Sequence, residues 1–352
     1  MAERKPDFNR LKKVLLRDGE PDILPLYEIF ADEEIIQAAM GKAGIEASIE
    51  FQYKMGYDYV GTEAAFGYTH RDTKNYVKDT GIPLPREARH FVNDNHGTIE
   101  NRDDFDSYPW PVIDDNVMAN IHKCTSMLPD GMKMIIGAGT GGILENVVWL
   151  MGYIPFSYAL QDEEQLIWDM FEKIGTNAER AMKIVMEKAD LSKVGAVIMG
   201  DDMGYDHSTM LSPKHMRQFV FPWQKKIADI AHDHDLPFIL HSCGNLEGVM
   251  DDLIDYVGID AKHSYEDKIL PVVEAKRRYG NRIAILGGVD MHFITTASVE
   301  QIEPYVAKVI HECAPGGGYA LGTGNSVANY VPLENYYEML RVGNEIGRKV
   351  YI

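Results

Sequence analysis

Residues 236–245 read Leu-Pro-Phe-Ile-Leu-His-Ser-Cys-Gly-Asn. The apolar part is typical of a short buried strand, and the Gly-Asn pair after it is a turn signal. His241 and Cys243 stand between the two. Side chains at positions i and i+2 of an extended chain point the same way, so these two can converge on one point. An imidazole and a thiolate together suit zinc, although the spacing also fits a packed cysteine beside a hydrogen-bonded histidine.

Similar apolar runs recur along the chain, and helical patterns such as 213–232 and 299–313 separate them. This alternation predicts parallel βαβ units. Eight such strands favour a single (β/α)8 TIM-type barrel that takes in residues 1–352 as one domain, while the pattern alone also allows a doubly wound open sheet. The expected strands are 23–26, 57–60, 132–136, 195–199, 237–240, 258–261, 282–286 and 318–321.

One segment, about residues 66–111, interrupts the alternation between the second and third expected strands. It is rich in His, Tyr and Trp but has no clean periodicity. We expect this long excursion to be a lid or a dimerisation arm, and in the second case the protein forms a homodimer.

Polar side chains stand at or just beyond the end of every expected strand. Active sites of α/β barrels are built at the carboxyl ends of the strands, so this pattern predicts a catalytic face at that end. In chain order the residues are Glu28, Glu63, Thr140, Asp202, His241, His263, Asp290 and Asn325.

Composition excludes several classes of function. The 352 residues carry a formal net charge of −19, which opposes binding to nucleic acid and to anionic membrane surfaces. The chain contains no uninterrupted apolar stretch of membrane-spanning length, and its first residues lack the apolar region of a signal peptide. Three cysteines are too few, and odd in number, for a disulfide framework. We therefore expect a cytoplasmic protein.

Several segments, taken in their order and spacing, resemble the uroporphyrinogen decarboxylase superfamily. Such a resemblance implies a distorted (β/α)8 barrel with its site at the carboxyl ends of the strands. The matching segments are residues 105–111 (Phe-Asp-Ser-Tyr-Pro-Trp-Pro), 211–222 (Leu-Ser-Pro-Lys-His-Met-Arg-Gln-Phe-Val-Phe-Pro), 241–245 (His-Ser-Cys-Gly-Asn), 285–290 (Ile-Leu-Gly-Gly-Val-Asp), 318–326 (Gly-Tyr-Ala-Leu-Gly-Thr-Gly-Asn-Ser) and 331–336 (Val-Pro-Leu-Glu-Asn-Tyr).

The superfamily contains two chemistries. True decarboxylases bind a polyacidic tetrapyrrole and carry an arginine-rich segment just after the first strand. Here residues 27–33 read Tyr-Glu-Ile-Phe-Ala-Asp-Glu, without an arginine. An acidic cavity mouth opposes a substrate with eight carboxylates, so we expect the other branch, the corrinoid-dependent methyltransferases that use zinc.

For this branch the resemblance implies that His241 and Cys243 bind zinc. In the coenzyme M methyltransferases the third zinc ligand is a cysteine between two glycines. The corresponding residues here, 322–324, read Gly-Thr-Gly, so that cysteine is replaced by Thr323. Further ligands would then be oxygen or nitrogen, and the candidates are Asp202, Asp290, Glu28, Glu63 and His263. Among these polar residues we expect Asp202 and Glu63 to be catalytic, and we expect Glu28, His263, Asp290 and Asn325 to bind substrate.

The implied reaction moves a methyl group from an O-methyl donor, an aryl methyl ether or an alcohol, to the cobalt of a corrinoid carried by a partner protein. Zinc acts as the Lewis acid in this O-demethylation. The alternatives are a uroporphyrinogen decarboxylase-type tetrapyrrole enzyme and a non-catalytic tetrapyrrole-binding protein.

Residues 137–142, Gly-Ala-Gly-Thr-Gly-Gly, match the Gly-x-Gly-x-x-Gly pattern of dinucleotide-binding folds. This makes an NAD-dependent oxidoreductase a remote alternative. That fold also needs a second strand ending in an acidic residue about 20 residues later. The following sequence is broken by Pro155 and poor in β-branched residues, so we expect a glycine-rich loop that makes room for a ligand.

Overall fold

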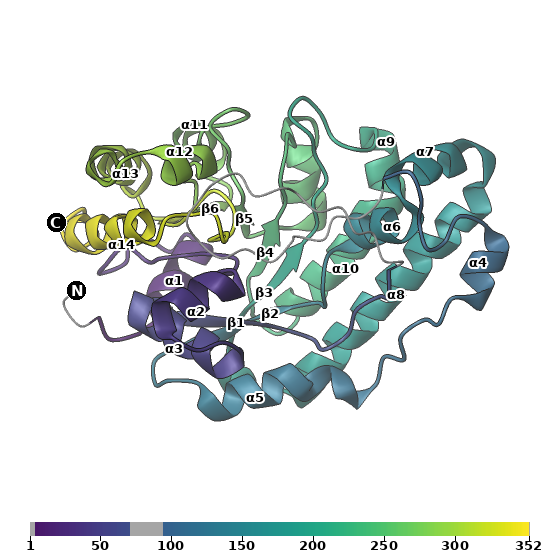
Figure 1. Ribbon diagram of the computed structural model, residues 1–352, viewed down its shortest axis with the longest axis horizontal. Helices are drawn as coiled ribbons and strands as arrows, with labels where there is room; N and C mark the ends of the chain where they lie inside the picture. The colour runs from purple at the N-terminus through teal and green to yellow at the C-terminus, as the bar shows by residue number, and fades with distance from the viewer. Residues whose placement is uncertain (1–3, 71–93, 352) are drawn as a thin grey trace.

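A computed structural model describes residues 4–70 and 94–351 of the chain. Its centre is a curled sheet of seven strands, all parallel, that neighbour one another in chain order (Figure 1). The strands are β1 Tyr59–Glu63, β2 Lys133–Gly137, β3 Val194–Gly200, β4 Phe238–His241, β5 Ala261–His263, β6 Ala284–Leu286 and β7 Tyr319–Ala320. Five of the seven are wholly buried or nearly so, as strands covered on both faces must be.

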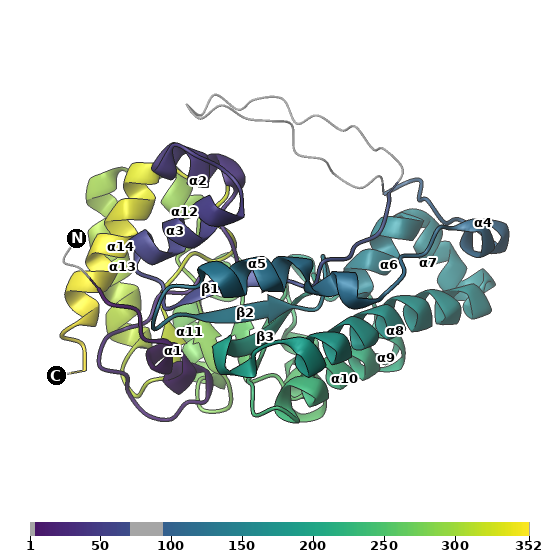
Figure 2. The same cartoon turned by 90° about the horizontal axis from the view of Figure 1, so that it is seen from below.

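Helices cover the outside of the sheet. Helices α13 and α14 pack on each other at one end of the molecule, while α4, α6, α7 and the outer part of α8 gather at the other end (Figures 1 and 2). The helices are α1 Phe8–Leu15, α2 Glu33–Met40, α3 Ile45–Met55, α4 Arg102–Ser107, α5 Ala119–Met127, α6 Ile143–Met151, α7 Tyr153–Asp162, α8 Glu164–Lys188, α9 Pro213–His215, α10 Phe221–His232, α11 Val272–Tyr279, α12 Met291–Thr296, α13 Val299–Cys313 and α14 Leu333–Gly347.

The helix expected at 213–232 is present but not uniform. A π-helical turn, Met216–Val220, separates α9 from α10. Pro222 explains the interruption, because its missing N–H cannot donate to the carbonyl of the preceding turn. A second π-helical segment covers Asp252–Val257, and short 3-10 turns cover Asp115–Met118, Leu191–Lys193 and Glu247–Val249.

The strand expected at 23–26 is wrong. The structure gives this segment a single parallel bridge, Leu26 to Leu321, and the described residues form seven strands instead of eight. Pro25 has no N–H to donate, and β7 offers only two residues for pairing, so a regular ladder cannot extend here. Three other strands start two or three residues later than expected: β1 at Tyr59 instead of 57, β5 at Ala261 instead of 258, and β6 at Ala284 instead of 282.

Residues 25–31 nevertheless bring the two edges of the sheet together. On one side, Tyr27 N–H donates to the Leu321 carbonyl at 2.8 Å, and Ala31 bridges Val327. On the other side, Glu28 N–H donates to the hydroxyl of Tyr59, a residue of β1, at 2.8 Å. The buried Glu28 carboxylate also accepts the Thr323 N–H at 2.7 Å. We call this junction of residues 25–31 with residues 321–327 the seam.

Half of the expected excursion, residues 71–93, lies outside the described residues, so its role as a lid or arm stays a prediction. In the described part of the chain, no single helix is long and apolar enough to cross a membrane. The adjoining helices α6 and α7 reach that length and composition only together, across a bend of 98°.

Candidate metal and substrate site

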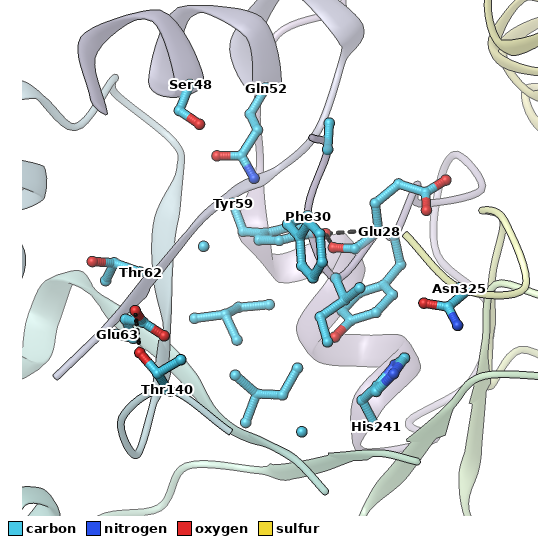
Figure 3. A pocket seen from close by; sticks show the side chains of 18 of the residues that line it. Glu28, Phe30, Ser48, Gln52, Tyr59, Thr62, Glu63, Thr140, His241 and Asn325 are labelled. Carbon is cyan, nitrogen blue, oxygen red and sulfur yellow. Dashed lines mark hydrogen bonds between the residues drawn. The ribbon is translucent and has the colours of Figure 1, made fainter. Parts of the chain in front are cut away.

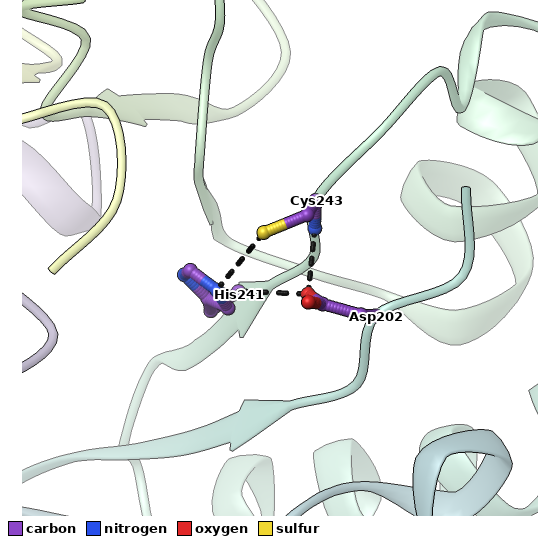
Figure 4. Close-up of side chains that lie close together, drawn as sticks. All are labelled: Asp202, His241 and Cys243. Atoms are coloured by element: carbon purple, nitrogen blue, oxygen red, sulfur yellow. Dashed lines mark hydrogen bonds and ion pairs between the residues drawn. The ribbon is translucent and has the colours of Figure 1, made fainter. Parts of the chain in front are cut away.

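Three side chains that can bind a metal converge at the carboxyl ends of β3 and β4. Their ligand atoms, on Asp202, His241 and Cys243, all lie within 4.8 Å of one another (Figure 4). His241 Nε2 is 3.6 Å from Asp202 Oδ1 and 3.6 Å from Cys243 Sγ. His241 ends β4 and pairs with Gly200 of β3, and this register brings Asp202 alongside it. The structure therefore brings His241 and Cys243 together, as their i, i+2 spacing predicts, and adds Asp202.

A chain of hydrogen bonds orients the His241 ring. The Thr323 carbonyl can only accept, so His263 Nε2, 3.2 Å away, must donate its proton to it. The neutral His263 ring then accepts at Nδ1, which lies 2.8 Å from His241 Nδ1. His241 therefore carries its proton on Nδ1, and its bare Nε2 faces Asp202 and Cys243. Burial lowers the pKa of His241 to about 3, with a smaller contribution from the positive charge of Lys262.

The Cys243 sulfur has its own hydrogen-bond donors. Asn325 Nδ2 lies 3.1 Å and Ser264 Oγ 3.5 Å from Sγ. The Cys243 N–H donates to Asp202 Oδ1 at 2.8 Å. Burial and the nearby Asp202 carboxylate raise the pKa of the thiol when no cation is present. A bound cation has the opposite effect, because a coordinating thiol is deprotonated.

Behind this cluster lies a buried cation. The Lys262 ammonium donates to the carbonyl oxygens of Ser242 at 3.1 Å, His263 at 3.3 Å and Ser264 at 2.7 Å. Burial lowers the pKa of Lys262 to about 8. The ammonium therefore holds together the loops that follow β4 and β5, directly beneath the ligand residues.

A cavity of about 660 Å³ opens onto the cluster (Figure 3). Its apolar wall is largely aromatic and includes Tyr27, Phe30, Tyr59 and Trp149. Among the described residues that line it, four are acidic and none is a lysine or arginine; the acidic ones are Glu28, Glu63, Glu145 and Asp202. Hydrogen-bonding side chains without charge complete the lining: Ser48, Gln52, Thr62, Thr140 and Asn325.

Adjacent Asp201 and Asp202 have different environments. Asp201 is fully buried and accepts the Glu145 N–H at 3.0 Å and Gln224 Nε2 at 2.7 Å, so it anchors the first turn of α6. Burial raises the pKa of Asp201 to about 6. Asp202 lines the cavity instead. Of these two carboxylates, Asp202 is therefore the one that can meet a ligand in the cavity.

Glu145 is a cavity residue that the sequence reasoning missed. Burial raises its pKa well above the ordinary value, and the negative charges of Asp202 and Asp201 raise it further. Its carboxylate accepts the Gly142 N–H at 3.3 Å in the first turn of α6. An acidic residue in the first turn of a helix that begins just after a strand was the available signal.

The other expected site residues divide into two groups. Glu63 ends β1, accepts Thr140 Oγ1 at 3.0 Å and opens onto the cavity, and its enclosure raises its pKa. Asn325 contacts the sulfur, and His263 lies behind His241. By contrast, Glu28 lines the cavity, but its carboxyl group is hydrogen-bonded to Thr323 in the seam, where burial raises its pKa to about 8. Asp290 caps α12 by accepting the Phe293 N–H at 2.9 Å, and the structure does not place it in the cavity lining.

The glycine-rich segment 137–142 connects β2 to α6 and contributes Gly137, Gly139 and Gly141 to the cavity wall. The residues after α6 form helix α7 instead of the strand that a dinucleotide-binding fold requires. The structure thus favours a ligand-accommodating loop over the nicotinamide site.

A curled parallel sheet with a cavity at the carboxyl ends of its strands defines an α/β protein of the barrel type. Residues 103–346 match the family model of uroporphyrinogen decarboxylase (URO-D), and the chain belongs to this family. Over its full length it also resembles a solved methyltransferase from Methanosarcina mazei, with a TM-score of 0.69, 15% identity, and coverage of 97% of this chain and 99% of the other. That likeness establishes the fold.

Two curated relatives are uroporphyrinogen decarboxylases. The protein from Trichodesmium erythraeum is 29% identical over 142 residues, which are 39% of this chain and 38% of the relative. The protein from Thioalkalivibrio sulfidiphilus is 27% identical over 143 residues, which are 40% of this chain and 39% of the relative. The matched segments thus span only about two fifths of the relatives' length.

Proposed function

We propose that this protein is a zinc-dependent methyltransferase that moves a methyl group from an O-methyl donor to the cobalt of a corrinoid carried by a partner protein. The observation that carries the proposal is the convergence of Asp202, His241 and Cys243 on a cavity without basic side chains among its described lining residues. The solved structure that this fold resembles over its whole length is also named a methyltransferase.

The three side chains suit zinc in the kind of ligand atom they offer and in the protonation state of the imidazole. They offer one oxygen, one nitrogen and one sulfur, the ligand atoms that zinc takes in proteins. The imidazole is neutral, and its bare Nε2 faces a carboxylate oxygen and a sulfur, so three lone-pair donors converge where a cation would balance them. Thr323, at the position of the third cysteine of related enzymes, turns its hydroxyl to Glu28. Asp202 would therefore be the third protein ligand.

Zinc at this point would supply a Lewis acid that stabilises the oxygen of the donor as its methyl group leaves. The residues around it have separate tasks. Asn325 and Ser264 hold the Cys243 sulfur by hydrogen bonds, and His263 holds the His241 ring. Glu145 lines the cavity, and the raised pKa of its buried carboxyl group favours the protonated form, so it would protonate the alcohol or phenol product.

The acceptor must reach the same cavity from outside. A corrinoid on a partner protein meets this requirement when it covers the cavity mouth and excludes water from the reacting groups. The corrinoid would supply the methyl acceptor, and Glu145 would give a proton to the donor oxygen that loses its methyl group.

Uroporphyrinogen decarboxylation is the second candidate, because the curated relatives carry that name. The cavity lining argues against it. A substrate with eight carboxylates would face Glu63 and Asp202 without a described lysine or arginine in the lining to pair with. Binding of a tetrapyrrole without catalysis meets the same objection.

The test combines metal analysis with spectroscopy. We expect about one zinc per chain, and loss of that zinc in the His241→Ala/Cys243→Ala double variant. With cob(I)alamin as the acceptor, methoxyarenes and methanol should convert cobalt(I) to methylcobalt(III). Glu187→Gln, a change at an exposed position of α8, serves as the matched control and should retain both properties. Zinc retained by the double variant, or release of carboxyl groups from uroporphyrinogen without methyl transfer from any donor, contradicts the proposal.

A further inference from the structure

The distribution of charge in the cavity narrows the class of methyl donor. Its described lining contains four acidic side chains and no lysine or arginine, and Glu63 lies apart from the metal-binding cluster. We propose that the donor carries no negative charge, being neutral or cationic, and that Glu63 accepts a hydrogen bond from the end of the donor remote from the metal. This inference rests on the proposed function and adds the substrate class to it.

Strand order places Glu63 across the cavity from the metal-binding cluster. Glu63 pairs with Gly137 of β2, Gly137 pairs with Ile198 of β3, and β3 in turn pairs with β4, which His241 ends. Three strand spacings amount to about 14 Å along the sheet, and to less across its curled face. Figure 3 shows Glu63 and His241 on different sides of the cavity. A donor whose methyl group lies at the metal therefore presents its other end toward Glu63.

The metal would not supply a positive charge for a carboxylated donor. The charges of the Cys243 thiolate and the Asp202 carboxylate together equal that of a divalent cation, so the loaded cluster is neutral. Lys262 cannot pair with a donor carboxylate either, because it is not among the described residues that line the cavity and its ammonium donates to three backbone carbonyls. A donor carboxylate would thus meet Glu63 unpaired, in a cavity partly shielded from water.

The other residues that line the cavity suit a donor molecule that is neutral or cationic. Tyr27, Phe30 and Tyr59 provide an aromatic wall, which packs well against a ring or a methylated ammonium group. Gln52 and Thr62 offer hydrogen bonds to hydroxyl or amine groups. Two carboxylates about 7 Å apart, at an effective dielectric constant of about 20, weaken binding by about 50-fold.

The experiment compares three donors that differ only in one substituent: 4-hydroxy-3-methoxybenzoate and the corresponding benzyl alcohol and benzylamine. Calorimetry on the zinc-loaded protein without corrinoid measures binding, and conversion of cob(I)alamin measures transfer. We expect the alcohol and the amine to bind, and the benzoate to bind at least about 50-fold more weakly. The isosteric variant Glu63→Gln should reduce this discrimination to a few-fold, whereas the exposed control Glu187→Gln should leave it unchanged.

The outcomes separate the two proposals. Benzoate binding as tight as that of the alcohol overturns the donor class, as does failure of all three compounds to bind. If the alcohol and the amine bind but cobalt is not methylated, the inferred ligand class stands and the proposed methyl transfer is contradicted. If the benzoate methylates cobalt as fast as the alcohol does, the methyl transfer stands and the inferred donor class is contradicted. If Glu63→Gln still discriminates against the benzoate, the proposed role of Glu63 is contradicted.

Discussion

Replacing His263 tests whether the hydrogen-bond chain behind His241 prepares the metal site. His263→Leu removes the acceptor at 2.8 Å from His241 Nδ1, and His241 is only 6% exposed, so water cannot easily replace it. The Nδ1 proton would then be buried without a partner, which costs about 1–3 kcal/mol, unless the proton moves to Nε2 and blocks the metal-binding atom. Loss of such a supporting group typically lowers metal affinity about 10- to 100-fold. We expect a decrease of that size.

Zinc affinity is measured by competition with a chromophoric chelator at constant pH. His263→Gln, whose amide oxygen can accept the Nδ1 proton, is the matched variant and should recover most of the affinity. The two variants also separate orientation from packing, because His263 contacts the Tyr27 ring at 5.1 Å between ring centres and both changes disturb that contact. Nitrogen NMR of the zinc-free protein reads the tautomer of His241 directly. Equal zinc affinity in the wild type and His263→Leu, or a proton found on His241 Nε2 in the wild type, would refute the reasoning.

Two further predictions concern stability. Glu28 keeps its proton up to about pH 8 in the folded protein but only up to about pH 4.5 in the unfolded chain. The folded state therefore binds more protons between these values, and the free energy of unfolding should fall as pH rises through this window, by up to about 5 kcal/mol. Urea unfolding of the wild type and of Glu28→Gln across this window checks it, since the variant should lose that pH dependence; equal slopes would contradict it. Gly142→Ala should lower the free energy of unfolding by about 1–3 kcal/mol, because its added carbon would lie 2.2 Å from Asp201 Cβ. In the control Gly248→Ala the added carbon has nothing within 4 Å, so this change should be nearly neutral. Equal urea midpoints for the two variants would contradict this prediction.

The sequence predicted best what depends on local spacing. His241 and Cys243 share a direction because they are two residues apart. Helix α13 has the expected bounds because its apolar periodicity is clean. The curled parallel sheet follows from the alternation of strands and helices. The first expected strand failed because Pro25 and the two-residue β7 limit backbone pairing, which hydrophobicity does not reveal.

What depends on register between strands could not be predicted. His263 was expected to bind substrate, yet its pairing with His241 across β4 and β5 places it behind that ring. Glu145 was missed because its raised pKa depends on burial and on the charge of Asp202, which is distant in the sequence. Asp290 is the opposite case: it was expected to bind substrate because it follows a strand, but in the structure it caps the next helix, α12.

The seam has a consequence for the order in which a newly made chain becomes functional. The Asn325 amide that holds the Cys243 sulfur lies 82 residues further along the chain. At about 5–20 residues per second, a ribosome needs about 4–16 s to add them. During that interval His241 and Cys243 exist without Asn325 and without the Thr323 carbonyl that sets the imidazole proton. Metal taken up early would meet an unfinished set of supporting groups, so delivery of the ion after release from the ribosome favours the correct site.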